Sequence, residues 1–248
     1  MKASITQIKT FKACRRAWDF KYHEHLIPVQ TQDALETGKS YHSYIEMMEN
    51  GEDLPEDYSK AAAMARAYQK YILPKFHVVA AEKELEKEIG AHTLHGFVDG
   101  LTDDGYIVEH KTTSADITEG GEYEYNLLWD EQVLAYMSLT GLRKVYYTVC
   151  KKPTIRLKTN ETDEELFNRM VEWYDTNTEE KIRVFVVERT DAEVEQFEKD
   201  FETICAQMQE GTIYRNTCHC NSWGRRCEFS SICLNYDPDQ QYVEFIKE

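Results

Sequence analysis

The stretch that most constrains the fold of this chain is residues 96–114, GFVDGLTDDGYIVEHKTTS, in which two largely apolar runs flank a polar turn. Asp104-Gly105 is a strong signal for a hairpin turn, and the runs on both sides of it are typical of strands. Side chains alternate between the two faces of a strand, so Glu109 and Lys111 are expected to point to the same side. The stretch therefore predicts a β-hairpin that brings Asp99 close to Glu109.

Two carboxylates and an ammonium group at one point are what a divalent-metal hydrolase needs. Carboxylate oxygens hold a hard cation, the cation acidifies a water molecule, and a lysine orients or stabilises the nucleophile. Charged residues make up 30% of this chain, however, so an acidic residue followed by Glu-x-Lys can also arise by chance. The remaining sequence decides between a reactive site and ordinary surface charge.

The overall composition indicates a globular protein of 248 residues, long enough for one large domain or two small ones. Its net charge of −16 argues against non-specific coating of nucleic acid, because that affinity comes largely from Lys and Arg. A nuclease is still compatible with this charge, because a bound metal adds local positive charge. No apolar run is long enough to cross a membrane and the first residues lack a signal-peptide core, so a cytoplasmic location is expected.

Periodicity and turn signals predict helices and strands that together form an α/β sheet with helices on its faces, preceded by a helical section. The expected helices span residues 4–25, 37–50, 57–75, 124–140, 161–175 and 190–210. The expected strands span residues 77–89, 93–101, 106–112, 144–150 and 182–188.

Three further polar residues lie where they could join the hairpin. Gln132 and Tyr136 are four residues apart on the helix after the hairpin, so they share one helix face. The alternative is a surface glutamine and a half-buried tyrosine. His42, on an earlier predicted helix, could supply a third metal ligand, although a lone histidine is more often a structural hydrogen-bonding residue.

The seven cysteines do not indicate a disulfide scaffold, because their number is odd and no export signal is present. Four of them lie close together near the C-terminus: Cys218, Cys220, Cys227 and Cys233. Cys14 is the outlier that folding could bring beside them. A cluster of four thiolates could hold zinc or a 4Fe–4S centre, with free buried cysteines as the alternative. Cys150 and Cys205 are expected in the core.

These residues resemble the RecB-like branch of the PD-(D/E)XK nuclease superfamily, whose members include CRISPR-associated RecB-like exonucleases, the AddB nuclease domain and phage-encoded exonucleases. Four patterns occur in the order found in that family. They are Gly38-x3-His42, Gly96-x2-Asp99, Glu109-His110-Lys111 and Gln132-x3-Tyr136. The resemblance spans residues 4–235.

The resemblance implies a restriction-endonuclease-like mixed sheet flanked by helices, in one nuclease domain over residues 1–248. Within it we expect a helical section at 1–75, a nuclease core at 76–190 and a C-terminal helix with a cysteine-rich tail at 191–248.

The same resemblance implies roles for the site residues. The metal, Mg²⁺ or Mn²⁺, would be held by His42, Asp99 and Glu109 with the backbone carbonyl of His110. Lys111 would position the attacking water and stabilise charge on the phosphate. Gln132 and Tyr136 would orient Lys111 and the DNA, so the catalytic set is Asp99, Glu109, Lys111, Gln132 and Tyr136.

Iron–sulfur members of the family carry one cysteine near the N-terminus and three near the C-terminus, which implies a 4Fe–4S cluster here. Cys14, Cys227 and Cys233 match three of these places. The family often has a tight Cys-x2-Cys pair, whereas here Cys218 and Cys220 compete for one place, and Cys220 is the better match. Zinc is the alternative occupant.

The implied activity is that of a metal-dependent DNA exonuclease that hydrolyses phosphodiester bonds of single-stranded DNA or DNA ends. It would act in recombination and repair or in phage DNA metabolism. Its expected partners are DNA and the proteins of a recombination or phage replication complex, and no association with a membrane is expected. The alternative is a DNA-end-binding recombination-accessory module with a degenerate nuclease site.

Overall fold

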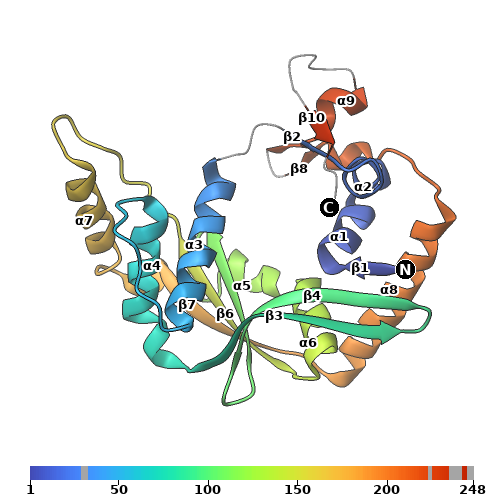
Figure 1. Ribbon diagram of the computed structural model, residues 1–248, viewed down its shortest axis with the longest axis horizontal. Coiled ribbons are helices and arrows are strands. Elements are labelled where there is room, and N and C mark those ends of the chain that lie inside the picture. Colours follow the sequence, from blue (N-terminus) through green and yellow to red (C-terminus); the bar gives the residue numbers. More distant parts are fainter. Residues whose placement is uncertain (29–32, 223–224, 235–241, 245–248) are drawn as a thin grey trace. The chain divides into compact units, whose positions relative to one another are not determined.

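A computed structural model describes residues 1–28, 33–222, 225–234 and 242–244 of the chain. Its main sheet contains six strands in the order β1-β4-β5-β6-β7, with β3 paired to β4 (Figure 1). The strands are β1 (Lys2–Ser4), β3 (Val78–Ile89), β4 (His92–Thr102), β5 (Ile107–Thr113), β6 (Lys144–Lys151) and β7 (Ile182–Glu188). The sheet is mixed, because β4/β5 and β6/β7 are antiparallel while β1/β4 and β5/β6 are parallel. The predicted mixed sheet with flanking helices is confirmed.

The chain forms two compact units. The sheet unit contains residues 33–85 and 96–194, and the terminal unit contains residues 1–32, 86–95 and 195–248. The expected helical section at 1–75 is thus divided between the two units. The assignment of a single nuclease domain to residues 1–248 stays a prediction.

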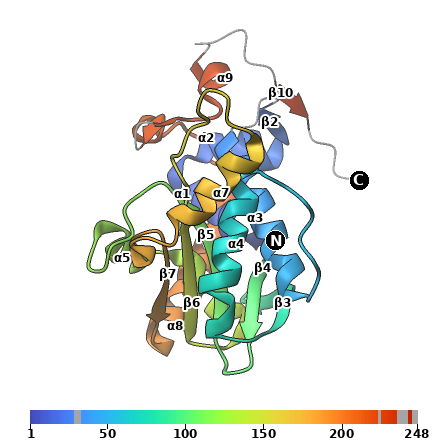
Figure 2. The same ribbon diagram turned by 90° about the vertical axis from the view of Figure 1, so that its left-hand side faces the viewer.

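The sheet unit has an apolar core on each face of its sheet. On one face, α3 (Asp33–Glu49) and α4 (Lys60–Tyr71) pack with β6 and β7 through residues such as Ile45, Met64 and Ile182 (Figure 2). On the other face, α6 (Glu131–Thr140) packs through Val133 and Met137 against side chains of β4 to β7. The remaining helices of this unit are α5 (Glu122–Leu127) and α7 (Asp163–Trp173), with 3₁₀ turns at Leu73–Lys75 and Thr178–Glu180.

The β4–β5 hairpin forms where the sequence predicts it. Gly100 pairs with Val108, and the turn closes with a 2.9 Å hydrogen bond from the Thr102 amide to the Tyr106 carbonyl. Gly105 has a φ of 83°, a conformation that glycine adopts at little cost. This register sets Asp99 opposite Glu109.

The terminal unit begins with β1 and α1 (Ile5–Ala13), and the Ser4 side chain caps α1 by accepting a hydrogen bond from Gln7. The prediction of one helix over 4–25 is wrong, because Cys14 has extended backbone angles (φ −161°, ψ 114°) and ends α1. A short α2 (Arg15–Trp18) and a π-helical turn (Asp19–His23) follow. The apolar periodicity continues across this break, so it gave no signal of it.

The other elements of the terminal unit are one long helix and several short segments. They are β2 (Leu26–Pro28), α8 (Asp191–Glu210, mostly in this unit), a 3₁₀ turn (Thr217–His219), β8 (Asn221–Ser222), β9 (Arg225–Arg226), α9 (Ser230–Leu234) and β10 (Tyr242–Glu244). Strand β2 pairs with β10 and β8 pairs with β9, both in antiparallel fashion.

The expected helix at 124–140 is two helices, α5 and α6. Asp130 lies between them in an extended conformation, and its side chain caps α6 by accepting a hydrogen bond from the Gln132 amide. Asp is a favoured N-cap, so a new helix start at this residue is physically reasonable. None of the helices in the described ranges is both long and apolar enough to cross a membrane.

Candidate active site

The β4–β5 hairpin brings its two carboxylates together. The Asp99 side chain accepts a 2.7 Å hydrogen bond from the backbone amide of His110, which fixes it against β5. Glu109 has a side chain that is only 1% exposed, and one of its oxygens forms an ion pair with the Lys111 ammonium. Its other oxygen is buried and has no hydrogen-bond partner among the residues that the structure describes. A buried carboxylate oxygen without a partner is costly, so Glu109 has the capacity to accept one more ligand.

Lys111 connects the hairpin to helix α6. Its ammonium donates to the side-chain oxygen of Gln132 at 3.2 Å, and the Gln132 amide donates to the Tyr136 hydroxyl at 2.7 Å. Gln132 and Tyr136 lie on one face of α6, as their spacing predicts. This chain of contacts holds the Lys111 ammonium beside Glu109.

A second group of ligands lies around Asp99. One side-chain atom from each of His42 (on α3), Glu82 (on β3) and Asp99 (on β4) lies within 4.8 Å of the other two. The Nδ1 atom of His42 is 3.7 Å from an Asp99 oxygen. An imidazole and two carboxylates are suitable ligands for a divalent cation.

The His110 side chain lies on the α3–α4 side of the sheet, away from Lys111. Its Nδ1 is 2.7 Å from the Thr148 hydroxyl, and its Nε2 is 3.2 Å from a Glu49 oxygen. Tyr68 donates a 2.6 Å hydrogen bond to the same Glu49 oxygen and packs its ring edge-on against the imidazole. The buried Glu49–His110 pair therefore fixes the strand segment between Glu109 and Lys111.

Burial and like charges shift the pKa values of these groups. Burial, with the nearby Asp99, raises the pKa of Glu109 to about 8. Burial of Lys111 works to lower its pKa, but the adjacent Glu109 and Asp99 outweigh that effect and raise it. Burial of His110 likewise opposes its charge, but Glu49 raises its pKa. These shifts favour the charged forms of Lys111 and His110.

His42 differs from Lys111 and His110, because burial lowers the pKa of His42 and favours the neutral imidazole that binds metals. The negative charge of the nearby Asp99 opposes that shift.

The structure thus brings the predicted catalytic residues together, but it divides the predicted metal ligands. His42 and Asp99 lie together, whereas the Glu109 carboxylate contacts Lys111 and lies outside the group formed by His42, Glu82 and Asp99. Sequence analysis did not single out Glu82 or Glu49. Glu82 lies in a run of alternating charges, AEKELEKE, that reads as strand surface, and Glu49 lies at the end of a polar helix.

The cysteines form a separate group within the terminal unit. Cys14, Cys227 and Cys233 pack in one apolar cluster with Phe20 and Phe229. Burial is the largest cause that raises the pKa values of Cys227 and Cys233. The nearby Cys14 and Cys220 thiols raise both values further. The Cys14 sulfur accepts from the Asn216 amide at 3.3 Å, and the Cys220 thiol is 4.0 Å from the Asn216 carbonyl.

Cys218 has an exposed side chain, whereas Cys220 is partly buried and its thiol raises the pKa values of Cys227 and Cys233. These observations favour Cys220 over Cys218 as the fourth member. The buried Cys150 lies in the core between β6 and α3–α4, as expected, and Cys205 is buried on α8.

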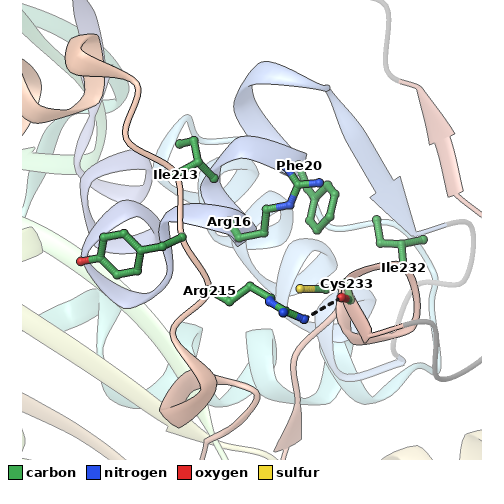
Figure 3. A pocket seen from close by; sticks show the side chains of 7 residues that line it. Arg16, Phe20, Ile213, Arg215, Ile232 and Cys233 are labelled. Carbon is green, nitrogen blue, oxygen red and sulfur yellow. Dashed lines mark hydrogen bonds between the residues drawn. The ribbon is translucent and has the colours of Figure 1, made fainter.

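A cavity of about 420 Å³ adjoins the cysteines on one side, and Arg16, Phe20, Ile213, Tyr214, Arg215, Ile232 and Cys233 line it. Figure 3 shows Arg215 directed toward Cys233, whose carbonyl accepts a 3.4 Å hydrogen bond from its guanidinium. Arg16 is paired with Asp19 at 2.5 Å and with Glu24 at 3.5 Å. The two arginines place positive charge beside Cys233, and the resulting Coulomb attraction works against the rise in its thiol pKa.

Comparison with known proteins identifies the family. The family model of the PD-(D/E)XK nuclease superfamily matches residues 2–234. The chain belongs to this superfamily. No curated protein sequence is similar enough to be identified as a relative.

One solved structure shows a similar fold, and two more give lower scores. A candidate exonuclease from Eubacterium rectale superposes with a TM-score of 0.54 at 14% identity, covering 94% of this chain and 87% of that one. The structure of the protein SSO0001 superposes with a TM-score of 0.49 at 14% identity, and the match covers 94% of this chain and 85% of the SSO0001 chain. An alkaline exonuclease from Laribacter hongkongensis gives 0.39 at 12% identity, with 85% and 89% covered. The fold is restriction-endonuclease-like, as expected.

Proposed function

We propose that this protein is a metal-dependent DNA exonuclease that hydrolyses phosphodiester bonds of single-stranded DNA or DNA ends. The observation that carries the proposal is the meeting of Asp99, Glu109 and Lys111 on one hairpin, beside His42 and backed by Gln132 and Tyr136. A member of the superfamily with a degenerate site would lack one or more of these groups, whereas all of them are present here.

The donor set fits Mg²⁺ or Mn²⁺. His42, Asp99, Glu109 and the His110 carbonyl would hold the ion, and they offer one imidazole and otherwise only oxygen atoms. The partnerless buried oxygen of Glu109 is the clearest sign of fit, because a cation would satisfy it. When bound, the ion would acidify a water molecule and neutralise charge on the phosphate.

The protein side chains then position and stabilise the reacting groups. The raised pKa of Lys111 keeps its ammonium charged, so it can donate hydrogen bonds to an attacking water or to a phosphate oxygen. Gln132 and Tyr136 hold the ammonium in place, so little rearrangement is needed when charge develops. The fixed Glu49–His110 pair beneath the strand keeps the Glu-x-Lys backbone rigid.

We further propose that Cys14, Cys220, Cys227 and Cys233 hold a 4Fe–4S cluster, with zinc as the alternative occupant. The cluster would join the N-terminal helices to the C-terminal segment within the terminal unit. In support, Cys14, Cys227 and Cys233 pack in one cluster and the Cys220 thiol acts on the pKa values of Cys227 and Cys233, while Cys218 is exposed. Bound iron would stabilise the folded state, because thiolate ligands far apart in the chain come together only on folding.

The biological setting follows as part of the proposal: recombination and repair or phage DNA metabolism, with other proteins of such complexes as partners. The second candidate is a DNA-end-binding accessory module with a degenerate nuclease site, and the net charge of −16 does not favour it, since an acidic protein binds DNA weakly. Such a module would bind DNA without cleaving it, so an assay of metal-dependent cleavage separates the two candidates.

The test is cleavage of 5′- and 3′-labelled single-stranded DNA with Mn²⁺, Mg²⁺ or EDTA, comparing wild type with Lys111→Ala. We expect metal-dependent products with the wild type and a rate at least ~100-fold lower in the variant, because a preorganised charged donor is lost. Lys70→Ala is the matched control, since Lys70 is exposed and pairs only with surface groups on the same unit. Equal rates in wild type and Lys111→Ala would exclude the proposed mechanism.

A further inference from the structure

We propose that Glu82 is an additional ligand of the active-site cation, beyond the four patterns that define the family resemblance. This inference rests on the proposed function, since it assumes that a divalent cation binds beside Asp99. It assigns a role to a residue of β3 that belongs to none of those patterns.

The geometry is the first argument. Glu82, His42 and Asp99 come from three different elements, yet one ligand atom of each lies within 4.8 Å of the other two. A spacing of this size suits atoms that surround a common ion, because ligands bound at about 2.1 Å from a metal lie roughly 3–4 Å apart. The Glu109 carboxylate is absent from this group because it is turned toward Lys111. Glu82 therefore adds a carboxylate on the His42 side of Asp99, while the second Glu109 oxygen remains available to the same ion.

The backbone is the second argument. Glu82 lies inside β3 but has a φ of +43°, in the left-handed region that a glutamate rarely adopts. A non-glycine residue with a positive φ inside a strand costs free energy. It also turns its side chain away from the direction that the regular alternation of side chains along a strand would give it. Here the redirected side chain reaches His42 and Asp99, which gives the irregular backbone a function.

The charge balance is the third argument. The carboxylates of Glu82 and Asp99 each place an oxygen within 4.8 Å of the other, so two negatively charged groups meet at this point. The nearby cations are already engaged, since Lys111 pairs with Glu109 and His110 pairs with Glu49. A divalent cation between Glu82 and Asp99 would balance these carboxylates.

An additional carboxylate has a measurable consequence for metal binding. It raises the negative charge of the site, so the protein should bind the cation in the absence of DNA, without a phosphate oxygen to complete the site. The inference therefore concerns the affinity of the free protein for metal, which can be measured apart from cleavage.

The experiment is calorimetric titration of the full chain with Mn²⁺ alone, comparing wild type with Glu82→Gln. We expect the affinity of the active-site ion to fall at least ~10-fold in the variant, because a charged ligand is replaced by a neutral one. Glu84→Gln is the matched control, since Glu84 lies two residues along the same strand and is exposed; its affinity should stay within about twofold of wild type. Wild-type affinity in Glu82→Gln would overturn the inference.

Two additional measurements separate this inference from the proposed function. Asp99→Asn should abolish the same binding event; if it leaves Mn²⁺ binding unchanged, the cation does not bind here and both proposals fail. If Asp99→Asn abolishes binding but Glu82→Gln does not weaken it, only the role of Glu82 is wrong. In EDTA, Glu82→Gln should unfold at or above the wild-type temperature, because a repelling charge is removed. A lower unfolding temperature would assign the carboxylate a structural role instead and would also overturn the inference.

Discussion

The active-site cluster (His42, Glu82, Asp99, Glu109 and Lys111) and the cysteine cluster (Cys14, Cys220, Cys227 and Cys233) are built in different ways. The active-site cluster lies on long strands and helices, and most of its polar groups already form hydrogen bonds or ion pairs with other groups of the chain. The second lies among short elements, such as a four-residue helix and two-residue strands, and its thiols make few hydrogen bonds. The active-site cluster is therefore arranged by the protein fold, whereas we expect the arrangement of the cysteine cluster to depend more on the metal or iron–sulfur group that we propose for it.

The largest effect should come from removing one cysteine ligand. Cys14→Ser should abolish the visible thiolate-to-iron absorbance and the bound iron of protein prepared without oxygen, because one ligand of four is lost. Cys218→Ser is the matched control, since this exposed residue is close in sequence but outside the cluster; it should keep wild-type iron. Absorbance and iron analysis of both variants check the prediction. A colourless wild type that contains zinc would instead support the alternative occupant, and iron loss in Cys218→Ser alone would contradict the assignment of Cys220.

An intermediate effect should come from breaking the buried pair beneath the active site. Glu49→Ala should lower the free energy of unfolding by about 3 kcal/mol, because the His110 imidazolium is left buried without its partner. The side chains of both residues are almost fully buried, at 1% and 3% exposure. Denaturant unfolding followed by circular dichroism measures the change.

The control for that variant is Glu36→Ala on the same helix. Glu36 is 52% exposed and pairs with Lys39, so its loss should cost less than about 1 kcal/mol. Equal destabilisation by the two substitutions would show that the Glu49–His110 pair contributes nothing specific, and the contrast between the two clusters would be weaker.

The smallest effect should be a change of stability with pH. The pKa values of Glu82 and Glu109 in the folded state, about 7 and about 8, lie above their value of about 4.3 in an unfolded chain. The folded state then binds more protons than the unfolded state between pH 5 and 8, so stability falls as pH rises through this window. The raised pKa of His110 acts in the same direction above about pH 6.5, and the lowered pKa of His42 opposes it below that pH.

Thermal unfolding in EDTA at pH 5, 6, 7 and 8 measures this dependence. We expect the unfolding temperature to fall by a few degrees between pH 6 and 8, and by less in Glu82→Gln, which lacks one of the titrating groups. Saturating Mn²⁺ should reduce the fall, because the cation favours the ionised carboxylates. An unfolding temperature that rises over this range would contradict the pKa directions.

The parts of the site that could be predicted from sequence are those fixed by local geometry. The Asp104-Gly105 turn sets the hairpin register, and strand alternation then sets Asp99 opposite Glu109 and aligns Glu109 with Lys111. Helical spacing similarly aligns Gln132 with Tyr136. These patterns involve residues close in sequence, so they could be recognised without knowledge of the fold.

The parts that could not be predicted depend on backbone irregularity or on distant contacts. The positive φ of Glu82 turns a residue of an ordinary charged strand toward the site, and nothing in AEKELEKE signals it. The break at Cys14 and the cap at Asp130 interrupt apolar periodicities that continue across them. Glu49 is paired with His110 only because α3 packs beside β5, and strand β1 is too short to produce a pattern.

The most direct test of the account is a crystal structure of the protein grown with Mn²⁺, with the ion located by its anomalous scattering. The account predicts an anomalous peak bonded to Asp99, with His42 and Glu82 among its other ligands and the His110 carbonyl facing it. A crystal saturated with Mn²⁺ that shows no peak at Asp99, or peaks only at exposed carboxylates elsewhere, would contradict the claim that this hairpin builds a metal-dependent active site.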